Sequence, residues 1–286
     1  MLRKNDMSQL IQMRQRMQAI DTIEKITHAM RLVAMSTITR LKSQLEYLHD
    51  YAKTIEQLYA TVATLANHQA ELLHPASAHE LIIVVGSQKG LCGNFNGTIA
   101  ASFEQFIATH HNAHVMTVGK KITELVSPLL RRSNIHIASF DGLTAATIPL
   151  IVENIITYLF TQRFYTHVWI VSGYTRNMFV QRARISTLLP VKIPPTLKMN
   201  VDDYIWEQDA QELADSLFKQ YVSAQLHTLL ITSLFAEQSA RFTSMDSATR
   251  NAKEVKEQMQ LTYNKARQAK ITKELTELTS SISGSF

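Results

Sequence analysis

The chain has 286 residues, of which 45% are hydrophobic and 19% charged, a composition that excludes an intrinsically disordered chain. Its one cysteine, Cys92, excludes a disulfide framework and a multi-cysteine metal site. The formal net charge is +5, and between positions 239 and 273 eight Lys or Arg stand against three Asp or Glu. That stretch indicates either an anionic partner or a solvated helix face.

The sequence shows no sign of a targeting or membrane-spanning segment. The beginning, MLRKNDMSQL, lacks the apolar core of a secretory signal, and no run approaches 18 apolar residues. We therefore expect neither a signal peptide nor a transmembrane helix.

The N-terminal segment reads as one long helix. Residues 1–74 contain neither glycine nor proline, the two residues that most destabilise a helix interior. Apolar residues recur at spacings of three and four, as in Leu10, Met13 and Met17, and the stripe continues over many turns. The pattern predicts a helix over about 7–67 that ends before Pro75.

The central segment, 75–195, alternates short apolar runs with helical patterns, which predicts a Rossmann-like α/β domain with a mainly parallel sheet. A further extended, alternating stretch predicts an antiparallel strand pair at the edge. The predicted strands are ELIIVVGS, HVMTVG, IHIASF and THVWIVSGY, followed by the edge stretch MFVQRARISTLLPV.

The C-terminal segment, 196–286, contains no proline, and its first glycine is Gly284. A helix from 208 to 283 would span about 114 Å, whereas a compact domain of the size of the central segment has a radius of gyration of about 14 Å. We therefore expect both terminal helices to project from the central domain. The apolar stripe of the last helix is thin, so we expect it to gain burial from partners.

Candidate chemistry is sparse. The sequence GSQKGLCGN, residues 86–94, stands between a strand and a helix, as a phosphate loop does, but Lys89 precedes Gly90 instead of following the second glycine. A phosphate-binding α/β enzyme therefore remains an alternative, beside the simpler interpretation of a tight turn with positive φ. Cys92 could be a nucleophile or an inert small residue. His110 and His114 could form a metal-binding face or could be two unrelated histidines. A basic coiled coil that binds nucleic acid is a further interpretation. The sequence lacks aromatic residues between the basic ones and any known nucleic-acid-recognition motif, so we expect no nucleic-acid partner.

Three motifs carry a resemblance that covers essentially the whole chain. The sequence AEQSARFTSMDSATRNAKEV, followed by MQLTYNKARQAKITKELTEL, resembles the C-terminal helix of the γ subunit of F-type ATP synthases. The sequence MRQRMQAIDTIEKITHAMRLVAMSTITRLK is similar to the N-terminal helix of that family, and SQKGLCGNFN to its glycine-rich signature. The family usually has arginine where this chain has Lys89, and Gly-Ala where it has Ser281 and Ile282.

The resemblance implies a rotor without cofactor or catalytic residues of its own. In that family the terminal helices form a long antiparallel coiled coil inside a ring of three α and three β subunits, and the α/β domain sits against the c-ring and the ε subunit. Ion flow turns the c-ring and this subunit, which drives the β sites through different conformations. The implied location is peripheral, on the cytoplasmic face of a bacterial cell membrane.

The resemblance also assigns partner contacts by matched motif. We expect the foot, facing the c-ring and ε, to include Tyr204 and Glu207. We expect contacts with the β subunit at Met30, Lys89, Cys92, Arg241, Arg267, Gln268 and Thr272.

Overall fold

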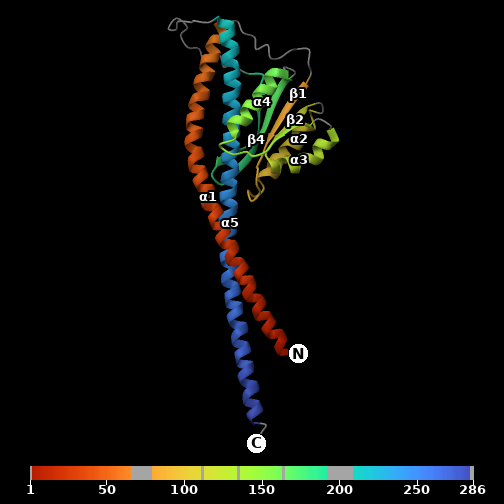
Figure 1. Cartoon of the computed structure of the whole chain (residues 1–286), viewed down its shortest axis with the longest axis vertical. Coiled ribbons are helices and arrows are strands. Elements are labelled where there is room, and N and C mark those ends of the chain that lie inside the picture. Colours follow the sequence, from red (N-terminus) through yellow and green to blue (C-terminus); the bar gives the residue numbers. More distant parts are fainter. Residues whose placement is uncertain are drawn as a thin grey trace. The chain divides into compact units, whose positions relative to one another are not determined.

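The computed structural model describes residues 2–65, 79–110, 113–133, 136–162, 165–191 and 209–283. They form two compact units, one made of Met1–Val33 with Phe242–Phe286 and the other of Ala34–Arg241. Helices α1 (Leu2–Leu65) and α5 (Ala210–Ser283) contribute to both units (Figure 1). The division of the chain at 74 and 195 stays a prediction, and Tyr204 and Glu207 lie outside the described residues.

The larger unit, Ala34–Arg241, is built on a five-stranded sheet in the order β3-β2-β1-β4-β5. Strands β1 to β4 run parallel, and β5 pairs antiparallel with β4 at one edge. The predicted parallel sheet and antiparallel edge pair are therefore confirmed. The strand bounds are His79–Val85 (β1), His114–Val118 (β2), His136–Phe140 (β3), Tyr165–Asn177 (β4) and Val180–Leu189 (β5).

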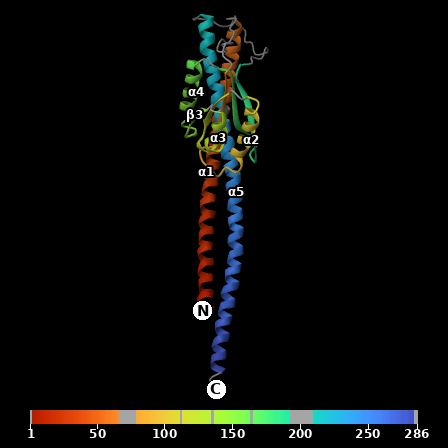
Figure 2. The same cartoon turned by 90° about the vertical axis from the view of Figure 1, so that its right-hand side faces the viewer.

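Helices cover both faces of this sheet. Successive side chains of β1 point to opposite faces of the sheet. Leu81 and Ile83 pack in the hydrophobic cluster that includes residues of α1, α4 and α5. Ile82 and Val84 pack in the cluster that includes residues of α2 and α3. Figures 1 and 2 show the two layers on either side of the strands. The remaining helices are α2 (Phe95–Ile107), α3 (Lys120–Ser133) and α4 (Ile148–Gln162).

One expectation needs correction. We expected the terminal helices to project from the domain, but the part of each that belongs to the larger unit packs on the sheet. Tyr59 of α1 is only 1% exposed and belongs, with Tyr221 of α5, to the same buried cluster as Leu81 and Ile83 of β1. In addition, the N–H of Gly173 in β4 donates to Ser233 Oγ of α5 at 3.3 Å. The physical reason is that a parallel sheet needs both faces covered, and the short helix α4 covers only part of this one.

The smaller unit consists of the first half of α1 and the second half of α5. Arg31 bonds Asp246, Thr249 bonds Thr27, and Lys256 bonds Asp21. Positions in α1 fall as those in α5 rise, so the two segments run antiparallel, which confirms the implied antiparallel coiled coil. None of the helices in the described ranges contains an apolar window long enough to cross a bilayer.

Candidate functional site

The glycine-rich loop, residues 86–94, connects β1 to α2 at the carboxyl edge of the parallel strands. The interpretation of a tight turn with positive φ is confirmed at Gly93, which has φ 57°. The other left-handed residue of the loop is Leu91, with φ 65°, although it carries a Cβ. The loop therefore holds one non-glycine residue in a conformation that L-amino acids rarely adopt.

The polar groups at this edge bond one another. The N–H of Ser87 donates to Asn96 Oδ1 at 2.9 Å, and Asn96 Nδ2 donates to Ser87 Oγ at 2.7 Å. The side-chain oxygen of Gln88 accepts the N–H groups of Lys120 at 3.1 Å and Gly142 at 2.8 Å. A phosphate loop instead directs such N–H groups at its ligand, so this arrangement does not support the phosphate-binding alternative.

Helix α5 holds the same loop through Arg241. Its Nη2 donates to Glu237 Oε1 at 2.6 Å, to the carbonyl of Lys89 at 3.2 Å and to the carbonyl of Gly90 at 3.3 Å. We call these four residues the Arg241 cluster. Both charged side chains are buried, and burial raises the pKa of the Glu237 carboxyl while the guanidinium opposes that rise. A buried charge pair that also bonds backbone is costly to break from either side.

The Cys92 side chain is turned to the interior. It is 2% exposed, and its Sγ lies 3.6 Å from Ser87 Oγ and 3.8 Å from Asn96 Nδ2. Burial raises the pKa of the Cys92 thiol, whereas a reactive cysteine needs an accessible thiolate. The structure therefore supports the interpretation of Cys92 as an inert small residue.

The exposed side chains of the loop are Lys89, Leu91 and Asn94, and Leu91 is 56% exposed. Sequence reasoning named Lys89, Cys92 and Arg241 but missed Leu91 and Glu237. The four-residue spacing of Glu237 and Arg241 in a helix could have indicated their pairing. No sequence signal marks a leucine that will take a positive φ.

The smaller unit presents the other expected contact residues. Met30 is half-buried, while Arg267, Gln268 and Thr272 are exposed on α5, where Thr272 Oγ1 donates to the carbonyl of Gln268 at 3.0 Å. Large apolar side chains are exposed beside them. A solvent-facing pair of helix segments with this much apolar surface is typical of a region that binds a partner. These apolar residues are Ile11, Ile23, Ile26, Leu32 and Val33 in α1, and Val255, Leu261, Ile271 and Leu275 in α5.

The histidine pair does not form a metal-binding helix face. Helix α2 ends at Ile107, so His110 and His114 do not share a helix. His110 Nδ1 lies 2.9 Å from the carbonyl of Phe106, and His114 Nδ1 lies 3.0 Å from the hydroxyl of Tyr165. Within the described ranges, no three His, Cys, Asp or Glu residues gather as metal ligands do.

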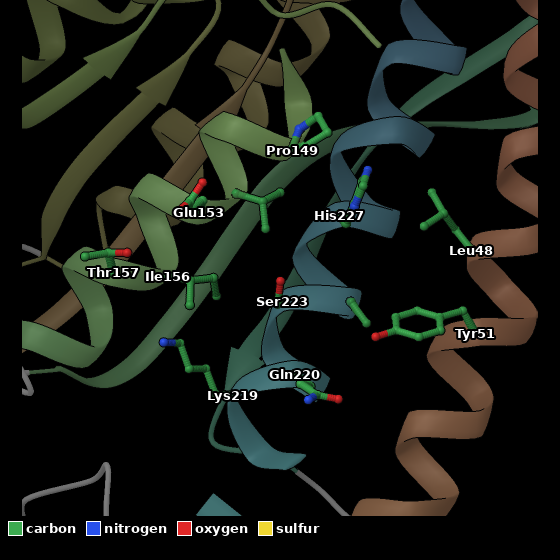
Figure 3. Close-up of a pocket in the computed structure, with 12 residues that line it drawn as sticks. Leu48, Tyr51, Pro149, Glu153, Ile156, Thr157, Lys219, Gln220, Ser223 and His227 are labelled. Carbon is green, nitrogen blue, oxygen red and sulfur yellow. The ribbon is translucent and has the colours of Figure 1, made fainter. Parts of the chain in front are cut away.

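A cavity of about 440 Å³ lies between α1, α4 and α5 in the larger unit (Figure 3). Its lining includes Glu153, Lys219 and His227, and burial lowers the pKa of His227. Figure 3 shows these three side chains at different corners of the cavity. A catalytic acid and base must converge on one reacting atom, so this lining does not indicate an active site.

Comparison with known proteins identifies the family. A family model described as ATP synthase matches residues 9–284. The ATP synthase gamma chain of Geobacter metallireducens is 30% identical over 284 residues, covering 96% of this chain and 98% of that relative. The chain belongs to the ATP synthase gamma-chain family. A gamma chain of Acidithiobacillus ferrooxidans is also 30% identical, covering 93% of this chain and 96% of its own length, and one of Hyphomonas neptunium is 27% identical.

Solved structures share the gamma-chain fold. A chain of the Euglena gracilis mitochondrial ATP synthase aligns with a TM-score of 0.66 at 12% identity, covering 97% of this chain and 94% of its own. A chain from the central stalk and c-ring of the Tetrahymena thermophila enzyme aligns with a TM-score of 0.56 at 19% identity, covering 78% and 99%. Membership in the gamma-chain family makes this chain a non-catalytic, central-stalk subunit of an ATP synthase.

Proposed function

We propose that this gamma chain is the rotor that couples ion-driven rotation of a c-ring to conformational change at the catalytic sites of β subunits. The observation that carries the proposal is the antiparallel pairing of α1 and α5 in the smaller unit, together with family membership over residues 9–284. Both helix segments are free of glycine and proline up to Ser283, as a stiff shaft requires.

Charged contacts between the helices resist sliding and twisting. Lys256 of α5 bonds both Asp21 and Glu24 of α1, and Arg31 bonds Asp246 at 2.7 Å. These pairs fix the register of the two helices. A shaft of fixed register passes torque along its length, whereas slipping helices would dissipate it.

The outer surface of the smaller unit suits a contact that is made and broken at every turn. Arg267, Gln268 and Thr272 are exposed polar groups, and an exposed ion pair contributes only about 0–1 kcal/mol, so partners can be exchanged. Rotation then acts on the catalytic sites through unequal contact energies in different orientations. Two helices present a lopsided cross-section, which a symmetric rod would lack.

The proposed partners are three α and three β subunits, an ε subunit and a c-ring. The β-facing residues are proposed to be Met30, Lys89, Cys92 and Arg241 with the polar trio on α5. The foot is proposed to include Tyr204 and Glu207. Support comes from the similar solved chains, one of which was determined with OSCP, F1 and the c-ring and another with the central stalk and c-ring. We place the complex on the cytoplasmic face of a bacterial cell membrane, with this chain peripheral to it.

Co-expression tests the proposal directly. Expressed with α and β subunits, the full chain should co-purify with them in one complex through gel filtration. Elution as a free monomer beside an assembled α/β ring would contradict the proposal.

A truncation tests the shaft. Removing residues 247–286 leaves the larger unit, Ala34–Arg241, complete. We expect its thermal unfolding to persist while coupled ATP synthesis in membrane vesicles falls severely. Unchanged synthesis by the truncated chain would refute the role of the shaft.

A further inference from the structure

We propose that the rings of His79 and His114 form an acid-sensitive switch at the amino end of the parallel sheet. Uncharged, the two rings stack; protonated, they repel each other and loosen the strands that begin there. We call this pair the stacked histidines. They lie in the larger unit, whereas the proposed rotor role rests on the smaller one, so either proposal can fail without the other.

The stacked histidines stand where the pairing of three strands begins. His79 is the first residue of β1, and His114 is the first residue of β2. His79 pairs with Tyr165 at the start of β4, and His114 pairs with Leu81 of β1. Because the ends of an element open more easily than its middle, a force between these two rings acts where the sheet is easiest to open.

The two rings lie close together and nearly parallel. Their centroids are 5.1 Å apart, and the angle between their planes is 19°. His79 is exposed, while His114 is half-buried. Protonation of one ring therefore places a positive charge against the other, and like charges at a protein surface repel more strongly than they do in bulk water.

Hydrogen bonds connect the ring of His114 to two tyrosines. Its Nδ1 lies 3.0 Å from the hydroxyl oxygen of Tyr165, which lies 2.9 Å from the hydroxyl oxygen of Tyr158 in α4. Tyr165 is 4% exposed, and its ring meets that of His114 edge-on with centroids 5.6 Å apart. A movement of His114 away from His79 therefore disturbs β4 and α4 as well as β2.

The charges around His114 disfavour its protonated form. Burial and, next, the charge of His79 lower the pKa of His114, and no carboxylate of the described residues raises it. Glu80, the next residue of β1, and its partner His167 in β4 lie on the opposite face of the sheet. His136 of β3 also lies on that face, because its partner on β2 packs in the cluster of α2 and α3.

The sign of the pH effect follows from this lowered pKa. The folded pKa of His114 lies below its ordinary value of 6.5, so the unfolded chain binds more protons than the folded one near that pH. The stabilisation is complete above about pH 6.5 and is lost as the pH falls through the folded pKa. Acid therefore weakens the amino end of the sheet.

The two tyrosines allow the switch to be tested by opposite shifts. Both nitrogens of a protonated imidazole donate, so Nδ1 of charged His114 donates to Tyr165, whose own hydroxyl proton then needs the oxygen of Tyr158. The neutral ring can instead accept from Tyr165 at Nδ1 and does not need Tyr158. Removing the Tyr158 oxygen thus disfavours the charged ring, whereas removing the charge of His79 favours it.

Nuclear magnetic resonance titration of labelled imidazoles in the full chain measures both shifts, with the His114 signal identified by its loss in His114→Gln. The pKa of His114 should rise in His79→Gln and fall in Tyr158→Phe. His49→Gln is the control, since His49 is exposed on α1, and it should change nothing. An unchanged His114 pKa in His79→Gln would overturn the switch, and an unchanged or raised pKa in Tyr158→Phe would overturn its connection to α4.

Hydrogen exchange of the full chain measures the consequence for the sheet. Corrected for the intrinsic effect of pH, the protection of amides at the start of β1 and β2 should fall about threefold or more between about pH 7.5 and about pH 5.5. The fall should shrink in His79→Gln and persist in His49→Gln. His227, whose pKa burial also lowers, is present in every variant, so its contribution cancels. No fall in the wild type, or an equal fall in His79→Gln, would overturn the switch.

Discussion

Arg31 and Asp246 stand 215 residues apart in the chain, yet their side chains meet at 2.7 Å across α1 and α5. Asp246 also accepts from Arg250, one helical turn away, at 2.9 Å. The carboxylate thus joins a bond within one helix to a bond between two helices. Both Arg31 and Asp246 are half-buried, so their ion pair is better shielded from solvent than that of Arg250.

Breaking this cross-helix pair should weaken the smaller unit measurably. We expect Arg31→Ala to lower its free energy of unfolding by about 0.5–1.5 kcal/mol, since the pair is partly shielded and charge-assisted. Arg250→Ala, the exposed control, should cost at most about 0.5 kcal/mol. Urea denaturation followed by helical circular dichroism measures both, and equal effects would contradict a special role for the cross-helix bond.

The smaller unit should lose stability in acid. Hydrogen bonds from Lys25 and Lys256 lower the pKa of Asp21 from 3.8 to about 2. Because the folded pKa lies below the unfolded one, the stabilisation is present above about pH 4 and is lost as the pH falls from 3.8 towards 2. Thermal unfolding measured from pH 5 to pH 2 should show this loss, and Asp21→Asn should reduce the slope. A slope identical in the variant would exclude Asp21 as the source.

Adding a side chain at Gly86 should destabilise the larger unit. A Cβ built on Gly86 would overlap the Cβ of Ile122 in α3, so Gly86→Ala should destabilise the larger unit by about 1–3 kcal/mol. A Cβ at Gly90 meets nothing within 4 Å, and Gly90→Ala should be neutral or stabilise by up to about 1 kcal/mol. Differential scanning calorimetry of the two variants separates them, and similar melting temperatures would contradict the close packing of β1 on α3.

Tyr59 should be a main support of the larger unit. It is 1% exposed, and its ring stacks on Tyr221 and lies tilted against Phe218, so Tyr59→Ala should cost about 3–5 kcal/mol. Tyr47 lies in the same helix but is 78% exposed, and Tyr47→Ala should change stability by less than about 0.5 kcal/mol. Chemical denaturation of the two variants and the wild type measures these changes in the free energy of unfolding. A mild effect at Tyr59 would mean that α1 contributes little to the core.

Sequence patterns predicted the helices and strands better than they predicted which elements pack against each other. The absence of glycine and proline predicts α1 and α5 because those residues act locally, and the β-branched run around Ile82 predicts a buried strand for the same reason. Periodicity shows that Leu41 and Tyr59 face something apolar, but it cannot distinguish a second helix from a sheet. For that reason the packing of α1 and α5 on the sheet was not predicted.

The candidate site was only partly readable for a related reason. The motif led to Lys89 and Arg241, yet the role of Arg241 depends on two carbonyls that lie about 150 residues earlier in the chain. Backbone oxygens occur at every position, so no residue type marks them. Leu91 shows the same limit, since its φ of 65° runs against the backbone preference of a residue with a Cβ.

The burial of Cys92 has a practical consequence for watching this molecule at work. It is the one cysteine of the chain, and its sulfur is shielded in the folded state. A cysteine introduced at an exposed position such as Arg267 would then react selectively with a maleimide dye. The wild-type background already suits single-molecule fluorescence, and the native thiol need not be removed first.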